Sequence, residues 1–115
     1  MECTLDTSIS MLARTPGVLR AMLMGVDERW TEPNYGPGTW SAREVVAHLI
    51  YADQADWLPR MRLIVEHGET RPFDPFDRAG HASLLAQNSL SALVDLFERE
   101  RTDNLAAVRL SLIHI

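Results

Sequence analysis

The sequence is organised around one stretch, residues 38–68, whose pattern predicts a single long amphipathic helix. Ser41 is placed to cap its start, and Glu44 three residues later completes an S-x-x-E capping box. Gly68 stands where a C′ glycine would end the helix. Between these ends, apolar residues recur at helical spacing: Val45, Leu49, Ala52, Trp57, Met61 and Ile64. His48 lies within this apolar stripe, so its role is the main functional question that the sequence raises.

Prolines interrupt two of the predicted helices. Pro59 lies inside the long helix and predicts a kink near Ala55, whose carbonyl loses its hydrogen-bond donor. Residues 5–26 form another segment with helical period, and Pro16 divides it. That segment is either one kinked helix or a short turn followed by a helix that begins at Pro16.

A third segment with helical period begins at Leu90, with Ser89 as its expected cap. We expect three charged residues to occupy its outer face: Arg99, Arg101 and Asp103. The apolar pattern stops abruptly at the sequence SLIHI, so the segment resembles a helix that has been cut short.

Two long connections join the three helical segments. Residues 27–39 hold prolines and glycines and read as a loop. Residues 69–87 read as an extended crossover that Phe73 and Phe76 pin to the helices, with a short helical turn near its end. Since no strand pattern is present, the sequence predicts an all-α bundle, in which a fourth helix would be needed to cover the exposed apolar faces.

The length of 115 residues predicts one domain, 1–115, with a single core. No apolar run approaches the roughly 20 residues that span a bilayer, and no secretion signal opens the chain, so we expect a cytoplasmic protein. The single Cys3 cannot form an intramolecular disulfide, which fits a reducing compartment. The net charge of −5, with no lysine and no arginine cluster, argues against nucleic acid as a partner.

His48 has two interpretations at this stage. A lone histidine on an apolar helix face is most often a core residue that donates to a carbonyl. The functional alternative is a neutral imidazole that binds a divalent metal in the core of a bundle. Ala52 and Ala55, one and two turns further on, would leave room for a ligand, whereas we expect Glu44 to be occupied by its capping role.

Other candidate residues have simpler interpretations. Asp56 and Arg60 have the i, i+4 spacing and the order that favour an ion pair at the helix surface. The remaining histidines have no partner at metal-ligand spacing, and we expect them to be solvated: His67, His81 and His114. Cys3 has no positioned base and is no nucleophile motif.

Taken in order, several blocks resemble the DinB/YfiT-like superfamily of metal-dependent bundle proteins, over about residues 15–110. The most specific block is W-S-x-x-E-V-x-x-H-L, which comprises Trp40, Ser41, Glu44, Val45, His48 and Leu49. The segment RPFDPFD and the stretch LFERER add support.

The resemblance implies an up-down-down-up four-helix bundle, with the fourth helix largely missing from this sequence. It also implies that His48 is the first of three metal ligands. The family takes the other two from a later H-D-x-x-H motif, which this sequence does not contain. Family members include metal-dependent thiol transferases and isomerases, so the resemblance implies a divalent metal, Zn²⁺ or Ni²⁺, and a low-molecular-weight thiol substrate.

Two functional hypotheses follow. In the first, the chain is part of a metal-dependent transferase or hydrolase, and with one ligand of three it binds metal weakly or not at all. In the second, the chain is a non-catalytic module that pairs with itself, as a homodimer, or with a second polypeptide through an uncovered apolar face.

Overall fold

The computed structural model describes residues 4–113, and every regular element within that range is helical. The elements are α1 (Leu5–Leu23), the 3₁₀ turn η1 (Glu28–Trp30), α2 (Ala42–Ala52), the π turn η2 (Asp53–Trp57), α3 (Leu58–His67), α4 (Ala82–Gln87) and α5 (Leu90–Ile113). The predicted all-α fold is therefore confirmed.

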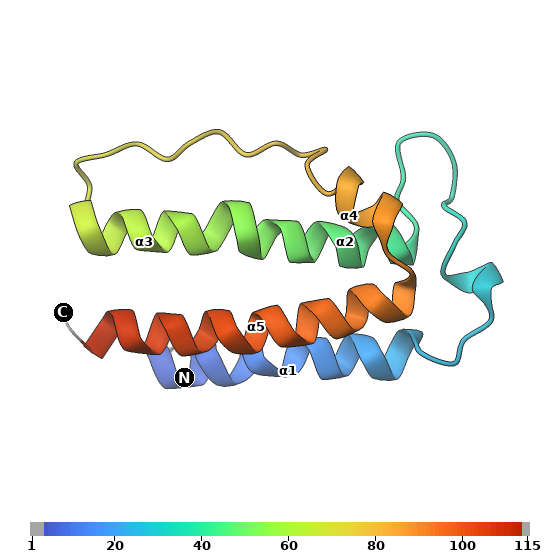
Figure 1. Ribbon diagram of the computed structural model, residues 1–115, viewed down its shortest axis with the longest axis horizontal. Helices are drawn as coiled ribbons and strands as arrows, with labels where there is room; N and C mark the ends of the chain where they lie inside the picture. The colour runs from blue at the N-terminus through green and yellow to red at the C-terminus, as the bar shows by residue number, and fades with distance from the viewer. Residues whose placement is uncertain (1–3, 114–115) are drawn as a thin grey trace.

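The long helices lie side by side, with α5 packed against both α1 and α2 (Figure 1). α1 runs in one direction, whereas α2 to α3 and α5 both run in the other, because the connection after α3 returns along the whole length of the bundle (Figure 1). This up-down-down order is the one that the sequence resemblance implies for the first three long helices.

The ends of the predicted long helix are where the sequence places them. Ser41 Oγ accepts a hydrogen bond of 3.1 Å from the backbone N–H of Glu44. Gly68 ends the helix with a φ of 60°, and its N–H donates to Ile64 at 2.8 Å. A positive φ favours glycine, since it has no Cβ to clash with the backbone.

The two proline expectations have different outcomes. Near Ala55 the helix changes to the π turn η2 before it continues as α3, with Pro59 in the first turn of α3. Because Pro59 has no N–H to give to the carbonyl of Ala55, this is where an irregular turn disturbs the fewest hydrogen bonds. Pro16, by contrast, is buried inside α1, which runs as one helix from Leu5 to Leu23.

Two fully buried residues of α2 are each one position later in the sequence than an apolar residue predicted to face the core. Val46 and Ile50 are fully buried, whereas Val45 is 38% exposed, and on α3 Ile64 is 53% exposed. The main cluster comprises Val46, Ala47, Ile50, Leu93, Val94 and Phe97. Apolar residues stand next to each other at 45–46 and at 49–50, so the helical period alone cannot decide which of each pair faces inward.

The prediction that Arg101 faces outward is wrong. Arg101 is 6% exposed and forms an ion pair with Asp53, which is 2% exposed. The position does lie on the inner face of α5, four residues after Phe97 and four before Leu105. A buried arginine requires a buried acid, and that acid stands 48 residues away in the sequence.

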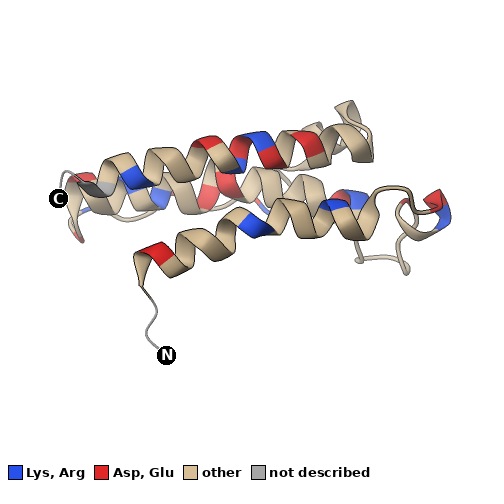
Figure 2. Cartoon of the chain, turned by 90° about the horizontal axis from the view of Figure 1, so that it is seen from below, with Lys and Arg blue, Asp and Glu red and all other residues tan. Residues whose placement is uncertain are grey.

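The other charged residues of the described chain are interspersed by sign along the helices (Figure 2). Arg20 of α1 bridges Asp95 and Glu98 of α5 at 2.7 Å each, at a solvent-exposed position. None of the helices described here combines the length and the apolar character needed to cross a membrane.

Candidate functional site

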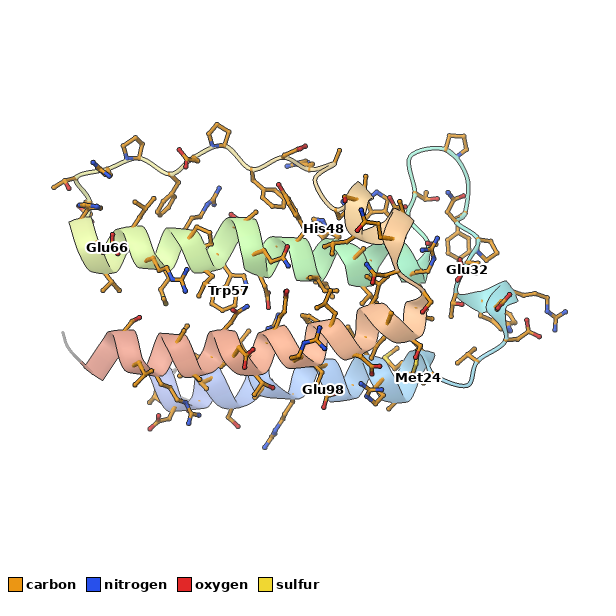
Figure 3. The ribbon with its side chains drawn as sticks, in the orientation of Figure 1. Met24, Glu32, His48, Trp57, Glu66 and Glu98 are labelled. Carbon is orange, nitrogen blue, oxygen red and sulfur yellow. The ribbon has the colours of Figure 1, made fainter. Side chains whose placement is uncertain are left out.

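His48 lies at the edge of the core, on the side of α2 that faces α4 and the second connection (Figure 3). Three rings surround it. The centroid of its imidazole is 4.6 Å from that of Trp40, 5.6 Å from that of His81 and 6.0 Å from that of Phe76. The site is thus built from the start of α2, the crossover and the residue that precedes α4.

His81 is the residue that sequence reasoning missed. The expectation that it is solvated is wrong, because it is only 4% exposed. Its Nε2 lies 2.9 Å from Oε2 of Glu44, and its ring meets that of His48 at an interplanar angle of 90°. The fold therefore brings together two histidines that stand 33 residues apart in the sequence.

Glu44 makes only the backbone half of the expected capping box. Its N–H donates to Ser41, but its carboxylate accepts from His81 instead. Glu44 and His48 lie four residues apart on α2, so both project from the same face of the helix. The cap fixes the first turn of α2 and thereby the position of the Glu44 carboxylate that contacts His81.

Close packing fixes the backbone next to His81. A Cβ built on Gly80 would overlap the ring of Tyr51, so any larger residue at this position would require that ring to move. Tyr51 in turn packs against Phe76, at 5.4 Å between ring centroids. Trp40 also borders the site, with its ring 5.0 Å from that of His81.

Two imidazole nitrogens in this site lack a partner. Nδ1 of His48 and Nδ1 of His81 are both buried, and neither has a hydrogen-bond partner among the described residues. Burial lowers the pKa of His48 below its ordinary value of 6.5; the neighbouring His81 lowers it further, and Asp56 partly opposes the shift. His48 is therefore neutral at pH 7, the form in which an imidazole nitrogen can bind a metal.

The side chains of the site that could bind a metal are few. Across residues 4–113, no group of three or more His, Cys, Asp or Glu side chains is arranged to hold an ion. His67 lies at the end of α3, 3.7 Å from Glu66, and plays no part in the site. His114 and Cys3 lie outside the described residues. The two orphaned nitrogens, Nδ1 of His48 and Nδ1 of His81, are of the type that binds a divalent metal.

The crossover is held as the sequence predicts. Arg60 pairs with Asp56 at 2.7 Å, and its guanidinium lies over the ring of Phe73, 5.0 Å from the centroid. Phe76 packs against Tyr51 and His48. The two phenylalanines therefore attach the crossover to α3 and α2, and the chain continues from there to His81.

Together these features define an all-helical bundle with an aromatic-lined histidine site beside its core. The family model of the DinB superfamily matches residues 11–111, and the chain belongs to that superfamily. A search of the curated proteins found no significant match.

Among solved structures, the chain is similar to YfiT from Bacillus subtilis, described as a probable metal-dependent hydrolase with an unusual four-helix bundle topology. The TM-score is 0.74 at 20% sequence identity. The match covers 95% of this chain and 64% of the YfiT chain. The likeness shows that the two proteins share a fold.

Proposed function

We propose that this DinB-like domain belongs to a metal-dependent hydrolase or thiol-dependent transferase, in which His48 is a ligand of a divalent cation, Zn²⁺ or Ni²⁺. The observation that carries the proposal is the buried Nδ1 of His48, which has no partner in the described structure. A buried polar atom without a partner costs free energy, so its presence in a folded chain calls for a ligand.

Two further observations support the proposal. The lowered pKa of His48 keeps the imidazole neutral, so no proton has to be displaced before a cation binds. YfiT, which shares the fold, is described as a probable metal-dependent hydrolase. The resemblance of the W-S-x-x-E-V-x-x-H-L block also implies that His48 is the first metal ligand of the family.

A bound divalent cation would supply a Lewis acid that lowers the pKa of a coordinated water or thiol. The residues of this chain would bind the cation and shield it from bulk water. His48 provides a nitrogen lone pair, Trp40 and Phe76 cover its ring and restrict water, and the cap at Ser41 fixes the first turn of α2. The substrate proposed for the whole protein is a small molecule, with a low-molecular-weight thiol as the nucleophile.

The test is a titration of the metal-free chain with Zn²⁺, followed by calorimetry, for the wild type and for His48→Gln. We expect weak binding in the wild type that His48→Gln abolishes. His67→Gln is the matched control, because His67 lies outside the site, and it should bind as the wild type does. Unchanged binding in His48→Gln would refute the proposal.

A second candidate function is self-association as a homodimer. Three apolar side chains on one face of α1 are exposed, at 63% for Met11, 53% for Val18 and 65% for Met22. Their spacing of seven and four residues aligns them along the helix. Light scattering on the eluting protein should then give the mass of a dimer, and Met22→Ser should shift it to that of a monomer; a monomeric wild type would reject this candidate.

A further inference from the structure

We propose that His81 provides a second nitrogen ligand beside His48, with Glu44 as the carboxylate that orients it, so that this chain holds a two-histidine site for Zn²⁺ or Ni²⁺. The inference rests on the proposed function and extends it, because His81 lies outside the H-D-x-x-H motif that the resemblance implies for the remaining ligands. It is carried by the geometry of three side chains from two separate segments.

The nitrogen of His81 that is free to bind a cation is Nδ1. A carboxylate oxygen can only accept, so the 2.9 Å contact with Glu44 places the proton of the neutral ring on Nε2. The lone pair then lies on Nδ1, which is buried and has no partner in the described structure. Metal-binding histidines commonly donate their other N–H to a carboxylate in this way, which fixes the tautomer and the orientation of the ring.

The imidazole rings of His48 and His81 have a separation that suits one shared cation. With Zn–N distances of about 2.1 Å, two imidazoles on one tetrahedral ion have centroids roughly 5 Å apart. The rings of His48 and His81 are 5.6 Å apart, so their separation is close to that of two imidazoles on one cation. Each ring carries one buried nitrogen without a partner, and one cation could satisfy both.

The two histidines are held in place by the residues packed around them. Trp40 contacts both imidazoles, at 4.6 Å and 5.0 Å between centroids. Gly80, against the Tyr51 ring, fixes the backbone on one side of His81, and α4 begins at the next residue. A site on such a framework is organised before the cation arrives, which reduces the entropy cost of binding. Two protein ligands leave coordination positions open for water, for substrate or for further ligands.

The first experiment compares Zn²⁺ affinity in the metal-free wild type with that in His81→Gln. The glutamine can still donate an N–H to Glu44 but lacks the ring nitrogen Nδ1, so the buried contact is kept while the ligand is lost. We expect His81→Gln to weaken binding at least tenfold. Glu44→Gln should weaken it by about 10- to 100-fold, the usual effect of losing an outer carboxylate. His67→Gln is the control and should have no effect.

The outcomes separate this inference from the proposed function. Wild-type affinity in His81→Gln, together with lost binding in His48→Gln, would overturn the role of His81 and leave His48 as the ligand. Wild-type affinity in His48→Gln would refute the proposed function itself. Circular dichroism on each variant shows whether it is folded.

A second measurement needs no substitution. The ¹⁵N resonances of the imidazole rings are followed in the wild-type chain while Zn²⁺ is added. We expect Nδ1 of His48 and Nδ1 of His81 to shift together and to saturate at one equivalent. A resonance of His81 that stays constant while that of His48 shifts would overturn the inference.

Discussion

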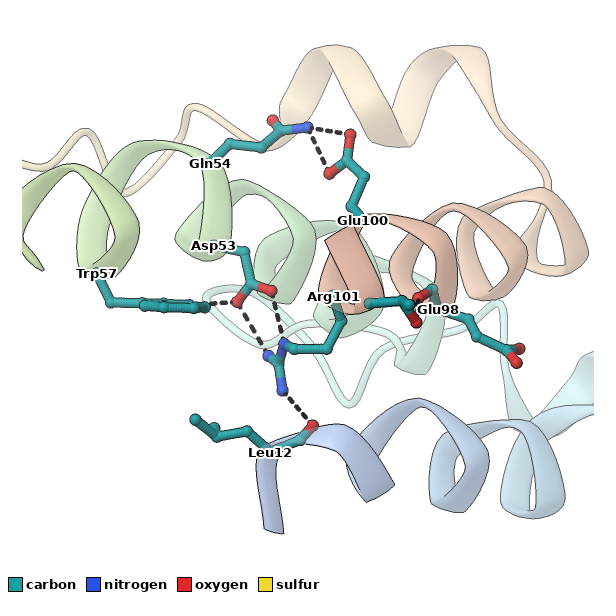
Figure 4. A network of polar contacts seen from close by, with 8 residues as sticks. Leu12, Asp53, Gln54, Trp57, Glu98, Glu100 and Arg101 are labelled. Atoms are coloured by element: carbon teal, nitrogen blue, oxygen red, sulfur yellow. Dashed lines mark hydrogen bonds and ion pairs between the residues drawn. The ribbon is translucent and has the colours of Figure 1, made fainter. Parts of the chain in front are cut away.

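Arg101 of α5 and Asp53 of η2 form a buried, two-pronged ion pair, with Nε to Oδ2 at 2.7 Å and Nη2 to Oδ1 at 2.9 Å (Figure 4). The third nitrogen of Arg101 donates to the carbonyl of Leu12 on α1 at 2.9 Å. Trp57 donates its indole N–H to Asp53. One arginine thus links α5, η2 and α1, and the charges are satisfied although both side chains are buried.

Removing one member of this pair should be costly. We expect Arg101→Met to reduce the free energy of unfolding by about 3–5 kcal/mol, because Asp53 would remain buried with an uncompensated charge. Arg99→Met, at an exposed position two residues earlier, is the control and should change it by less than about 0.5 kcal/mol. Urea unfolding measures both, and equal effects would show that the pair contributes little.

Replacement by alanine should have opposite effects on the stability of the fold at two glycines. Gly80→Ala should destabilise the fold by about 1–3 kcal/mol, because its Cβ would overlap the Tyr51 ring. Gly17→Ala, in the interior of α1 with open space around it, should stabilise by about 0.5–1 kcal/mol. Thermal unfolding of the two variants provides the comparison. A stable Gly80→Ala protein would mean that Tyr51 moves aside easily.

The cap of α2 should contribute a measurable share of its stability. Ser41→Ala removes the acceptor for the N–H of Glu44, and we expect a loss of about 1 kcal/mol. Ser91→Ala, at an exposed position within α5, is the control and should have little effect. Denaturant unfolding distinguishes the two variants, and equal stabilities would show that water replaces the cap at no cost.

The lowered pKa of His48 has a consequence for stability against pH. The unfolded chain titrates this histidine near 6.5, whereas burial lowers the folded value. Between these two values the unfolded state binds more protons, so the free energy of unfolding rises with pH. The contribution is present above pH 6.5 and is lost as the pH falls through the folded pKa.

Urea unfolding of the metal-free chain at a series of pH values tests this expectation. The wild type should lose more stability than His48→Gln as the pH falls below 6.5. If the free energy of unfolding of the two proteins changed with pH in parallel, His48 would have the same pKa in the folded and the unfolded state. A steeper loss in His48→Gln would contradict the direction of the shift.

The fold could be predicted from local signals because those signals agree with one another. The cap at Ser41, the glycine at position 68 and the period of the apolar residues all point to the same helix, and its ends are confirmed. The sequence could not decide which face of α2 points to the core, since Val45 and Val46 are adjacent and both apolar, and either one could face inward. Packing against Phe97 makes that choice, and it is a tertiary effect.

The site was predictable only in part. A motif identifies His48, but no characteristic spacing in the sequence connects His48 with His81. A long extended segment of the chain brings His81 next to His48. The signals that could have pointed to His81 were the glycine before it and the phenylalanines that direct the crossover back along α2. Arg101 was missed in the same way, because its partner Asp53 lies on another helix.

The π turn has a consequence for how the chain can change in length. Asp53 and Leu58 are both buried, although on a regular α-helix residues five apart face about 140° away from each other. The wider turn between them absorbs one residue and returns Leu58 to the inner face. Deletion of Ala55 would therefore restore a regular helix and leave α3 facing as it does now, whereas a regular helix that kept all of these residues would rotate α3 by about 100°. In an alignment with a relative that lacks the turn, a one-residue gap should therefore fall within residues 53–57.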